Sequence, residues 1–318
     1  MKLFFWLLGS FGVALILTLI TSYVCYRMVF RAPKKKVLGP DEYEIPEGEI
    51  YEVFRDEMVQ WIKDVRSMPH EDVSITSYDG LTLRGKYYEC KKGATTEIMF
   101  HGYKGNAERD LCGAVERAFA IGRNALIVDH RASGTSDGNV ITFGIKERRD
   151  CRAWIDFATE KFGKDVNLMI TGISMGAATV MMTAGQELPE NVVCVLADCG
   201  YTSPKEIIQK VVTDMKLPKA VFYPFIKLGA RLYADFDLEE YSPIEAMKNC
   251  KIPVIFVHGD NDEFVPHDMS KRLYEACAAQ KKVFITIKGA GHGLAYPVNK
   301  EEYIAKLKEI DLEWHLYS

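Results

Sequence analysis

The chain has 318 residues, a hydrophobic fraction of 48% and a formal net charge of −4. This length and composition allow one α/β domain with a large core, and the slight acidic balance argues against a nucleic-acid-binding surface. The eight cysteines show no C-x-x-C spacing. They are therefore interpreted as buried thiols in a reducing compartment and not as a zinc site or a disulfide framework.

The N-terminal stretch from Leu3 to Tyr26 contains no charged residue. As a helix its roughly 24 residues would measure about 36 Å, which is enough to cross a hydrocarbon core of about 30 Å. The stretch is too long for the apolar part of a cleaved signal peptide, and no small-residue cleavage site follows it. We therefore expect residues 1–30 to form a transmembrane anchor with its flank.

The charges around this stretch predict its orientation. One basic side chain, Lys2, precedes it, and five follow: Arg27, Arg31, Lys34, Lys35 and Lys36. An excess of basic residues marks the cytoplasmic side of a membrane helix. We therefore predict a single-pass membrane protein whose large domain is cytoplasmic, with the basic cluster near anionic headgroups.

Prolines and glycines among charged residues predict a linker over residues 31–48. The domain is expected at 49–318. Its first segment, Ile50–Ser67, has a helical apolar period and is expected to lie against the domain. The segments Val73–Tyr78 and Leu81–Tyr88 alternate around Asp79-Gly80, which predicts a β-hairpin.

Strand-like and helix-like segments alternate after the hairpin, which predicts a mainly parallel, doubly wound sheet of the α/β class. The expected strands are Thr95–Phe100, Ala125–Asp129, Leu168–Ile173, Val192–Ala197, Ile252–Val257 and Val283–Ile287. The expected helices are Asn106–Ile121, Ile145–Phe162, Asp268–Ala279 and Glu301–Trp314.

Residues 202–250 contain no strand-like segment and are too long for a plain crossover. They predict a small helical cap over the carboxyl edge of the sheet. Within it, Phe222 and Phe225 are candidates for binding an acyl chain. Alternatively, the segment Leu217–Leu232 contacts the membrane surface, because its lysines and prolines argue against a second span.

The motif Gly172-Ile173-Ser174-Met175-Gly176 lies between an apolar strand and an alanine-rich helix. This is the context of the G-x-S-x-G nucleophile elbow, a tight turn that exposes a serine at the carboxyl edge of a sheet. The glycines leave room for the strand and helix to cross closely. Ser174 is therefore the predicted nucleophile.

The base and the acid are expected after Ser174 in the chain order Ser, Asp, His. His292 follows the last strand at the correct edge of the sheet, whereas His101 and His258 are expected to have structural roles. Asp262, after the strand Ile252–Val257, is the preferred acid, and Asp260 is the alternative. The oxyanion hole is expected to use the backbone N–H groups of Met175 and Tyr103; this chemistry needs no metal and no cofactor.

Several motifs resemble those of the α/β-hydrolase superfamily of serine hydrolases. They are His101-Gly-Tyr103, Asp129-His-Arg-Ala-Ser-Gly-Thr-Ser-Asp-Gly138, the elbow at Ser174, Ala197-Asp-Cys-Gly-Tyr201, the segment His258–Pro266 and Gly291-His292. More narrowly, the chain is similar to membrane-anchored bacterial hydrolases of the Bem46 and ABHD13 type. The resemblance implies the triad Ser174, Asp262 and His292, and a superfamily of esterases, lipases, thioesterases and peptidases.

We therefore predict a membrane-anchored serine hydrolase that cleaves small-molecule acyl esters. A serine peptidase of aminopeptidase type and a thioesterase are the alternatives on the same fold. Acidic residues of the cap keep the peptidase open, because they would suit a free amino terminus: Asp235, Asp237, Glu239 and Glu240. A non-catalytic binding scaffold is a more remote alternative. The sequence does not indicate an oligomeric state.

Overall fold

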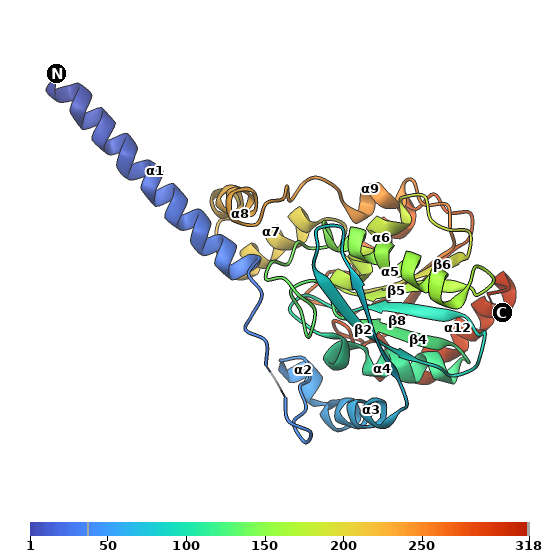
Figure 1. Cartoon of the computed structure of the whole chain (residues 1–318). Helices are drawn as coiled ribbons and strands as arrows, with labels where there is room; N and C mark the ends of the chain where they lie inside the picture. The colour runs from blue at the N-terminus through green and yellow to red at the C-terminus, as the bar shows by residue number, and fades with distance from the viewer. Residues whose placement is uncertain (37, 317–318) are drawn as a thin grey trace.

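The computed structural model describes residues 1–36 and 38–316, so Val37 of the predicted linker and the last two residues of the predicted domain lie outside it. Its centre is an eight-stranded sheet in the order β1-β2-β4-β3-β5-β6-β7-β8 (Figure 1). The strands are β1 (Glu71–Thr76), β2 (Thr82–Tyr88), β3 (Thr96–Phe100), β4 (Asn124–Val128), β5 (Leu168–Ile173), β6 (Val192–Asp198), β7 (Val254–Gly259) and β8 (Lys282–Ile287).

The predicted hairpin and parallel sheet are confirmed. β1 pairs antiparallel with β2, and β2 pairs antiparallel with β4. The pairs from β4 across to β8 are all parallel. The carboxyl ends of these parallel strands therefore meet at one edge of the sheet, where a site can form.

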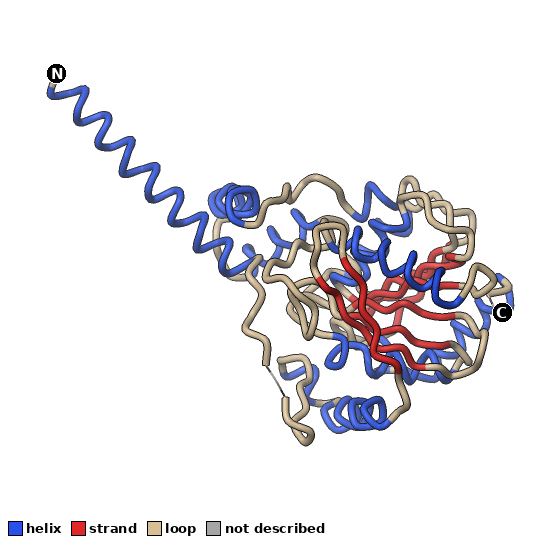
Figure 2. The backbone as a smooth tube through the Cα atoms, viewed as in Figure 1, coloured by secondary structure: helices blue, strands red, loops and turns tan. Residues whose placement is uncertain are grey.

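Helices cover both faces of the sheet, as Figure 2 shows with strands in red and helices in blue. One core lies between the sheet and α3 (Arg55–Ser67), α4 (Ala107–Ala120), α11 (Ala295–Val298) and α12 (Lys300–Trp314). The other lies against α5 (Glu147–Phe162), α6 (Met175–Ala184) and α10 (His267–Ala276). A short helix, α2 (Glu49–Glu52), precedes α3.

The region 202–250 forms three helices: α7 (Pro204–Asp214), α8 (Lys219–Tyr233) and α9 (Pro243–Met247). α8 packs beside the C-terminal part of the N-terminal helix α1 (Lys2–Val29), as Figure 1 shows. The two backbones cross closely at Gly229, where a Cβ atom would lie 2.5 Å from the carbonyl oxygen of Ser22. Only glycine allows this approach.

The segment Phe4–Val29 is the one helix among the described residues that is long and apolar enough to cross a membrane. Its mean hydropathy is 2.1, and its apolar window is not buried in the protein. Figure 1 shows α1 projecting away from the domain at its N-terminal end.

The C-terminal end of α1 belongs to the folded body. Phe30 is fully buried and packs edge-on against the rings of Phe143 and Phe236. The following residues also lie on the domain, since the backbone of Arg31 forms an isolated β-bridge with Val140 and Ile45 is buried in the core. Among its described residues the predicted linker forms no helix. It nevertheless contacts the domain, because apolar side chains such as that of Ile45 pack against the core.

Candidate active site

Ser174 occupies the turn between β5 and α6, as the elbow motif predicts. Its backbone is strained, with φ 55° and ψ −114°. A Cβ atom at Gly172 would lie 2.1 Å from the backbone of Gly176, and one at Gly176 would lie 2.0 Å from the carbonyl oxygen of Phe100. The two glycines therefore permit the crossing of strand and helix that holds Ser174 in this conformation.

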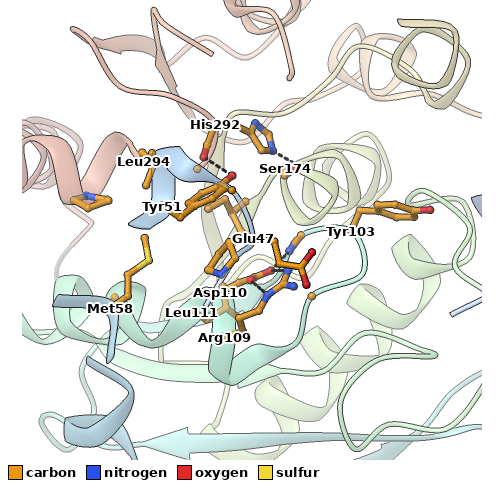
Figure 3. A pocket seen from close by; sticks show the side chains of 18 of the residues that line it. Glu47, Tyr51, Met58, Tyr103, Arg109, Asp110, Leu111, Ser174, His292 and Leu294 are labelled. Atoms are coloured by element: carbon orange, nitrogen blue, oxygen red, sulfur yellow. Dashed lines mark hydrogen bonds and ion pairs between the residues drawn. The ribbon is translucent and has the colours of Figure 1, made fainter. Parts of the chain in front are cut away.

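Three predicted side chains form one chain of hydrogen bonds. His292 Nε2 lies 2.9 Å from Ser174 Oγ, and His292 Nδ1 lies 2.7 Å from Asp262 Oδ2. Figure 3 shows His292 pointing at Ser174. The three residues come from the ends of β5, β7 and β8, so the parallel sheet brings together positions that are far apart in sequence.

Asp262 is held from several sides. Its Oδ1 accepts backbone N–H bonds from Phe264 at 2.9 Å and Val265 at 2.8 Å, and its Oδ2 also lies 3.0 Å from His258 Nε2. Burial alone would raise the pKa of Asp262, but the hydrogen bonds from His258 and His292 outweigh burial and hold the pKa well below its usual value. This carboxylate is therefore ionised at neutral pH.

The alternative acid, Asp260, does not contact His292. Its Oδ1 accepts the backbone N–H of Gly289 at 2.6 Å and so ties the loop after β8 to the loop after β7. A further carboxyl group in the cavity wall, Asp198, accepts a hydrogen bond from the hydroxyl of Tyr303 at 3.0 Å. Burial raises the pKa of Asp198 to about 6. Asp262 is thus the carboxylate bonded to His292.

The two expected oxyanion residues flank Ser174. Met175 is the first residue of α6, and Tyr103 lies in the loop between β3 and α4. That loop passes close to the nucleophile, because a Cβ atom at Gly102 would lie 3.6 Å from Ser174 Cβ. The N–H of Gly102 donates to Asp110 Oδ2 at 3.1 Å, which fixes the loop. The side chain of Tyr103 points away from Ser174 (Figure 3).

Tyr51 is a site residue that sequence reasoning missed. Its hydroxyl donates to the carbonyl oxygen of His292 at 2.9 Å (Figure 3). The apolar period of Ile50–Ser67 predicts that this segment lies on the domain, but the period does not indicate which loop it meets. The segment before the first strand thus supports the loop that carries the imidazole.

His101 and His130 have structural roles beneath the site. The backbone N–H of His130 donates to His101 Nε2 at 3.0 Å, and His130 Nε2 donates to the carbonyl oxygen of His101 at 3.1 Å. Burial lowers the pKa of His101 to about 4 and that of His130 to about 3. Both rings are therefore neutral at physiological pH and join the ends of β3 and β4.

A cavity of about 1280 Å³ opens beside Ser174 and His292. Much of its wall is apolar and comes from α2, α3, α4 and the residues after His292; it includes Ile50, Phe54, Met58, Trp61, Leu111 and Leu294. Such a mostly apolar cavity with a few polar groups is typical of a small-molecule site. Its lining also carries both signs of charge, with Lys34 and Lys36 as well as Glu47 and Glu49.

The predicted cap residues Phe222 and Phe225 do not line this cavity. They lie on α8 and pack against the core cluster that contains Cys25, Tyr26 and Phe30. The physical reason is that α8 packs beside α1 and not over the cavity. The prediction of an acyl pocket at these two residues is therefore corrected: the apolar wall beside Ser174 comes from α2, α3, α4 and the residues after His292.

Among the described residues, one group could offer metal ligands: Cys199, Asp262 and His292, whose ligand atoms lie within 4.8 Å of one another. Asp262 and His292 are already bonded to each other. Burial raises the pKa of the Cys199 thiol well above its usual value, which disfavours the thiolate that a metal requires. The geometry suits proton transfer along the hydrogen bonds better than metal binding.

The elbow, the mainly parallel sheet and the hydrogen-bonded Ser, His and Asp define the class of protein: it is an α/β hydrolase. Residues 142–310, more than half of the chain, match the model of the prolyl oligopeptidase family. The chain belongs to this family.

Relatives agree with this assignment. The protein YqkD of Bacillus subtilis is 26% identical over 236 residues, which cover 74% of this chain and 77% of YqkD. Protein bem46 of Schizosaccharomyces pombe is 24% identical over 226 residues, covering 69% of each chain. The expected similarity to Bem46-type proteins is thus confirmed.

Solved structures show the same fold. The esterase Pf2001 of Pyrococcus furiosus superposes with a TM-score of 0.67 at 22% identity, covering 90% of this chain and 98% of that one. Est1E from Butyrivibrio proteoclasticus, solved with ferulic acid, gives a TM-score of 0.58 at 21% identity and covers 76% of this chain and 98% of that one. At this identity the likeness concerns the fold.

Proposed function

We propose that this protein is a serine hydrolase that cleaves acyl esters through an acyl-enzyme on Ser174. The observation that carries the proposal is the hydrogen-bonded chain from Ser174 Oγ through His292 to Asp262. A serine becomes nucleophilic when a base lies within hydrogen-bond reach and the base is oriented by a third group. Both conditions are met, and Ser174 and His292 line a cavity large enough for a substrate.

The mechanism follows from this geometry. Ser174 Oγ attacks the acyl carbonyl carbon while His292 Nε2 takes the hydroxyl proton, and the ionised Asp262 stabilises the imidazolium through Nδ1. The N–H groups of Met175 and Tyr103 stabilise the oxyanion. The tetrahedral intermediate then collapses, and His292 returns the proton to the leaving alcohol. A water molecule, deprotonated by His292, hydrolyses the acyl-enzyme and restores Ser174.

Ester cleavage is favoured because the wall beside Ser174 is mostly apolar and suits an acyl group. An aminopeptidase-like activity is the second candidate, and three glutamates that line the cavity favour it: Glu44, Glu47 and Glu49. The cap acids give it less support, because Asp237 pairs with Arg231 and Glu239 pairs with Lys227. A thioesterase would use the same groups.

A fluorophosphonate probe and a substrate panel test this proposal. The wild type should be labelled and Ser174→Ala should not. p-Nitrophenyl esters should be cleaved faster than acyl thioesters and aminoacyl amides, and His292→Ala should lower ester turnover by about four orders of magnitude. Asp262→Asn should cost far more activity than the matched Asp260→Asn. Turnover retained in Ser174→Ala would contradict the mechanism, and a preference for aminoacyl amides would favour the peptidase.

We further propose that α1 anchors the enzyme in a membrane with the domain on the cytoplasmic side. The apolar, unburied helix and the basic residues after it support this arrangement. All eight cysteines lie within the described residues; Cys90 is exposed and the other seven, including Cys277, are buried. A membrane-impermeant thiol reagent should therefore label Cys90 only after cells are permeabilised. Labelling of intact cells would reverse the orientation.

A further inference from the structure

α8 presents a row of apolar side chains that the protein leaves exposed or only partly covers. Val221, Pro224, Phe225, Leu228 and Leu232 repeat with the spacing of one helical face; we call them the α8 stripe. Val221 and Leu232 are 53% and 51% exposed, and Phe225 and Leu228 are partly exposed. A contiguous exposed apolar row on a soluble surface marks an interaction site.

Apart from Phe225, which lies at its edge and also packs partly against the core cluster, the α8 stripe is separate from the face of α8 that packs on the protein. Tyr223, Ile226, Gly229 and Ala230 are buried, and they contact the end of α1 and the domain. The helix is therefore apolar on two sides, of which the fold uses one. The stripe also does not line the cavity at Ser174, so substrate binding does not account for it.

The position of α8 along α1 indicates what covers the stripe. Contact between the helices begins near Leu19, whose carbonyl oxygen accepts a hydrogen bond from the hydroxyl of Tyr233 at 3.3 Å. The part of α1 before the close crossing at Ser22, from Phe4 to Thr21, comprises about 18 residues, or about 27 Å of helix. That length matches a hydrocarbon core of about 30 Å. The C-terminal end of α8, at Tyr233, then lies where the hydrocarbon ends.

Aromatic and charged residues mark the same level. The rings of Tyr23, Tyr26 and Tyr233 form a cluster at the crossing, with centroids 5.3 to 6.0 Å apart. Tyrosine is enriched at the boundary between bilayer and water. Along the chain, the basic residues Arg27 and Arg31 follow directly after Tyr26, and α8 itself begins with Lys219. They would meet anionic headgroups.

We propose that the α8 stripe inserts into the headgroup region of the bilayer that α1 spans, so that the protein touches the membrane through two helices at an angle. The inference rests on the proposed membrane anchoring by α1. An apolar face flanked by basic residues and lying beside a spanning helix has the chemistry of an interfacial helix. The occupant of the stripe is therefore lipid and not a second copy of the chain.

Site-specific fluorescence in vesicles tests this contact. The full-length Cys90→Ser protein is reconstituted in phosphatidylcholine and phosphatidylglycerol vesicles, and single cysteines are introduced by Leu17→Cys on α1, Val221→Cys and Leu232→Cys on the stripe, and Leu312→Cys on α12. Each is labelled with an environment-sensitive dye. Leu312 is the matched control, because it is an apolar residue, 67% exposed, on α12, which packs in a different core cluster from α8.

Dyes at positions 17, 221 and 232 should shift to shorter wavelength and be quenched by spin-labelled lipid, with deeper quenchers acting on position 17. The dye at position 312 should respond only to an aqueous quencher. If position 17 is quenched by lipid but positions 221 and 232 are not, the stripe contact is wrong and the anchoring stands. If position 17 is not quenched, both fail. Shielding of the stripe from both quenchers would assign it to a protein partner and overturn the proposal.

Discussion

The hydroxyl of Tyr103 donates a hydrogen bond of 2.6 Å to the carbonyl oxygen of Val29, the last residue of α1. Beside it, Lys104 Nζ donates to the carbonyl oxygen of Met28 at 3.0 Å. The last carbonyls of a helix have no partner within the helix, and here the loop next to Ser174 supplies partners. The membrane-anchor candidate is thus bonded to the loop that carries a proposed oxyanion donor.

This bond predicts that Tyr103→Phe lowers kcat for ester hydrolysis while KM changes little. The N–H of residue 103 remains, but its loop loses a hydrogen bond worth about 1 kcal/mol, which corresponds to roughly fivefold in rate if the bond orders the donor. Steady-state kinetics with a water-soluble ester measure the effect. Tyr223→Phe, which removes a hydroxyl bonded to Glu239 in the cap, is the control and should leave kcat unchanged. Equal kinetics for Tyr103→Phe and wild type would contradict this coupling.

Tyr51→Phe should also lower kcat, by roughly fivefold. The variant removes the hydrogen bond to the carbonyl oxygen of His292 and leaves the imidazole attached to a less ordered loop. Tyr43→Phe is the control and should behave as wild type, because the Tyr43 ring contacts Lys63 and Arg66 on α3. The rate of fluorophosphonate labelling at Ser174 gives a second readout, because it depends on His292 but not on product release. Unchanged labelling in Tyr51→Phe would show that the loop is held without this bond.

The preferred length of the acyl chain should depend on α2, which contributes Ile50 to the cavity wall. Ile50 lines the cavity and is half exposed, so a larger side chain can be accommodated there without unfolding the protein. Ile50→Trp should shift the maximum of kcat/KM in a p-nitrophenyl ester series toward shorter chains, since each methylene that is no longer buried costs about 0.8 kcal/mol.

Phe222→Ala is the matched control for this series, because Phe222 lies on α8 and outside the cavity wall. It should leave the chain-length profile unchanged. A profile that responds to Phe222→Ala and not to Ile50→Trp would return the acyl site to the cap.

Stability should fall as the pH falls below about 6.5. The pKa of His101 is about 4 and that of His130 about 3 in the folded protein, against an ordinary value of about 6.5 in the unfolded chain. Between these values the unfolded chain binds protons that the folded protein does not bind, so the free energy of unfolding decreases as pH decreases from about 6.5 toward 4. Urea denaturation at several pH values measures this slope.

His130→Gln should reduce the slope, whereas the exposed His315→Gln should not change it. In His130→Gln the side-chain amide can still donate to the carbonyl oxygen of His101, so the fold at neutral pH should be retained. A free energy of unfolding that is constant between pH 7.5 and 5 in the wild type would contradict the assignment of two neutral buried histidines.

The sequence predicts the elements that depend on local patterns. The elbow at Ser174 can be predicted from the sequence, because the close crossing of strand and helix requires glycine at positions 172 and 176. The choice of His292 follows because a parallel sheet collects the carboxyl ends of its strands at one edge. These relationships need the order of the elements and no detail of their packing.

The rest depends on contacts between distant segments. The bond from Tyr51 to His292 joins residues 241 positions apart, and no period or motif in either segment refers to the other. From the sequence, Phe225 is equally compatible with an acyl-chain contact and a membrane contact, because an apolar helix face does not indicate what packs against it. The structure resolves part of this question by packing α1 on α8.

If α1 spans a membrane as proposed, the close crossing of Gly229 and Ser22 links the enzyme to the bilayer. Helices whose backbones touch cannot swivel freely against each other, so a change in the tilt of α1 turns α8 with it. Membrane helices adjust their tilt to the thickness of the bilayer. Through Tyr103 and Val29 the same tilt reaches the loop beside Ser174. Within the proposed arrangement, bilayer thickness becomes a physical variable that acts on the geometry of catalysis.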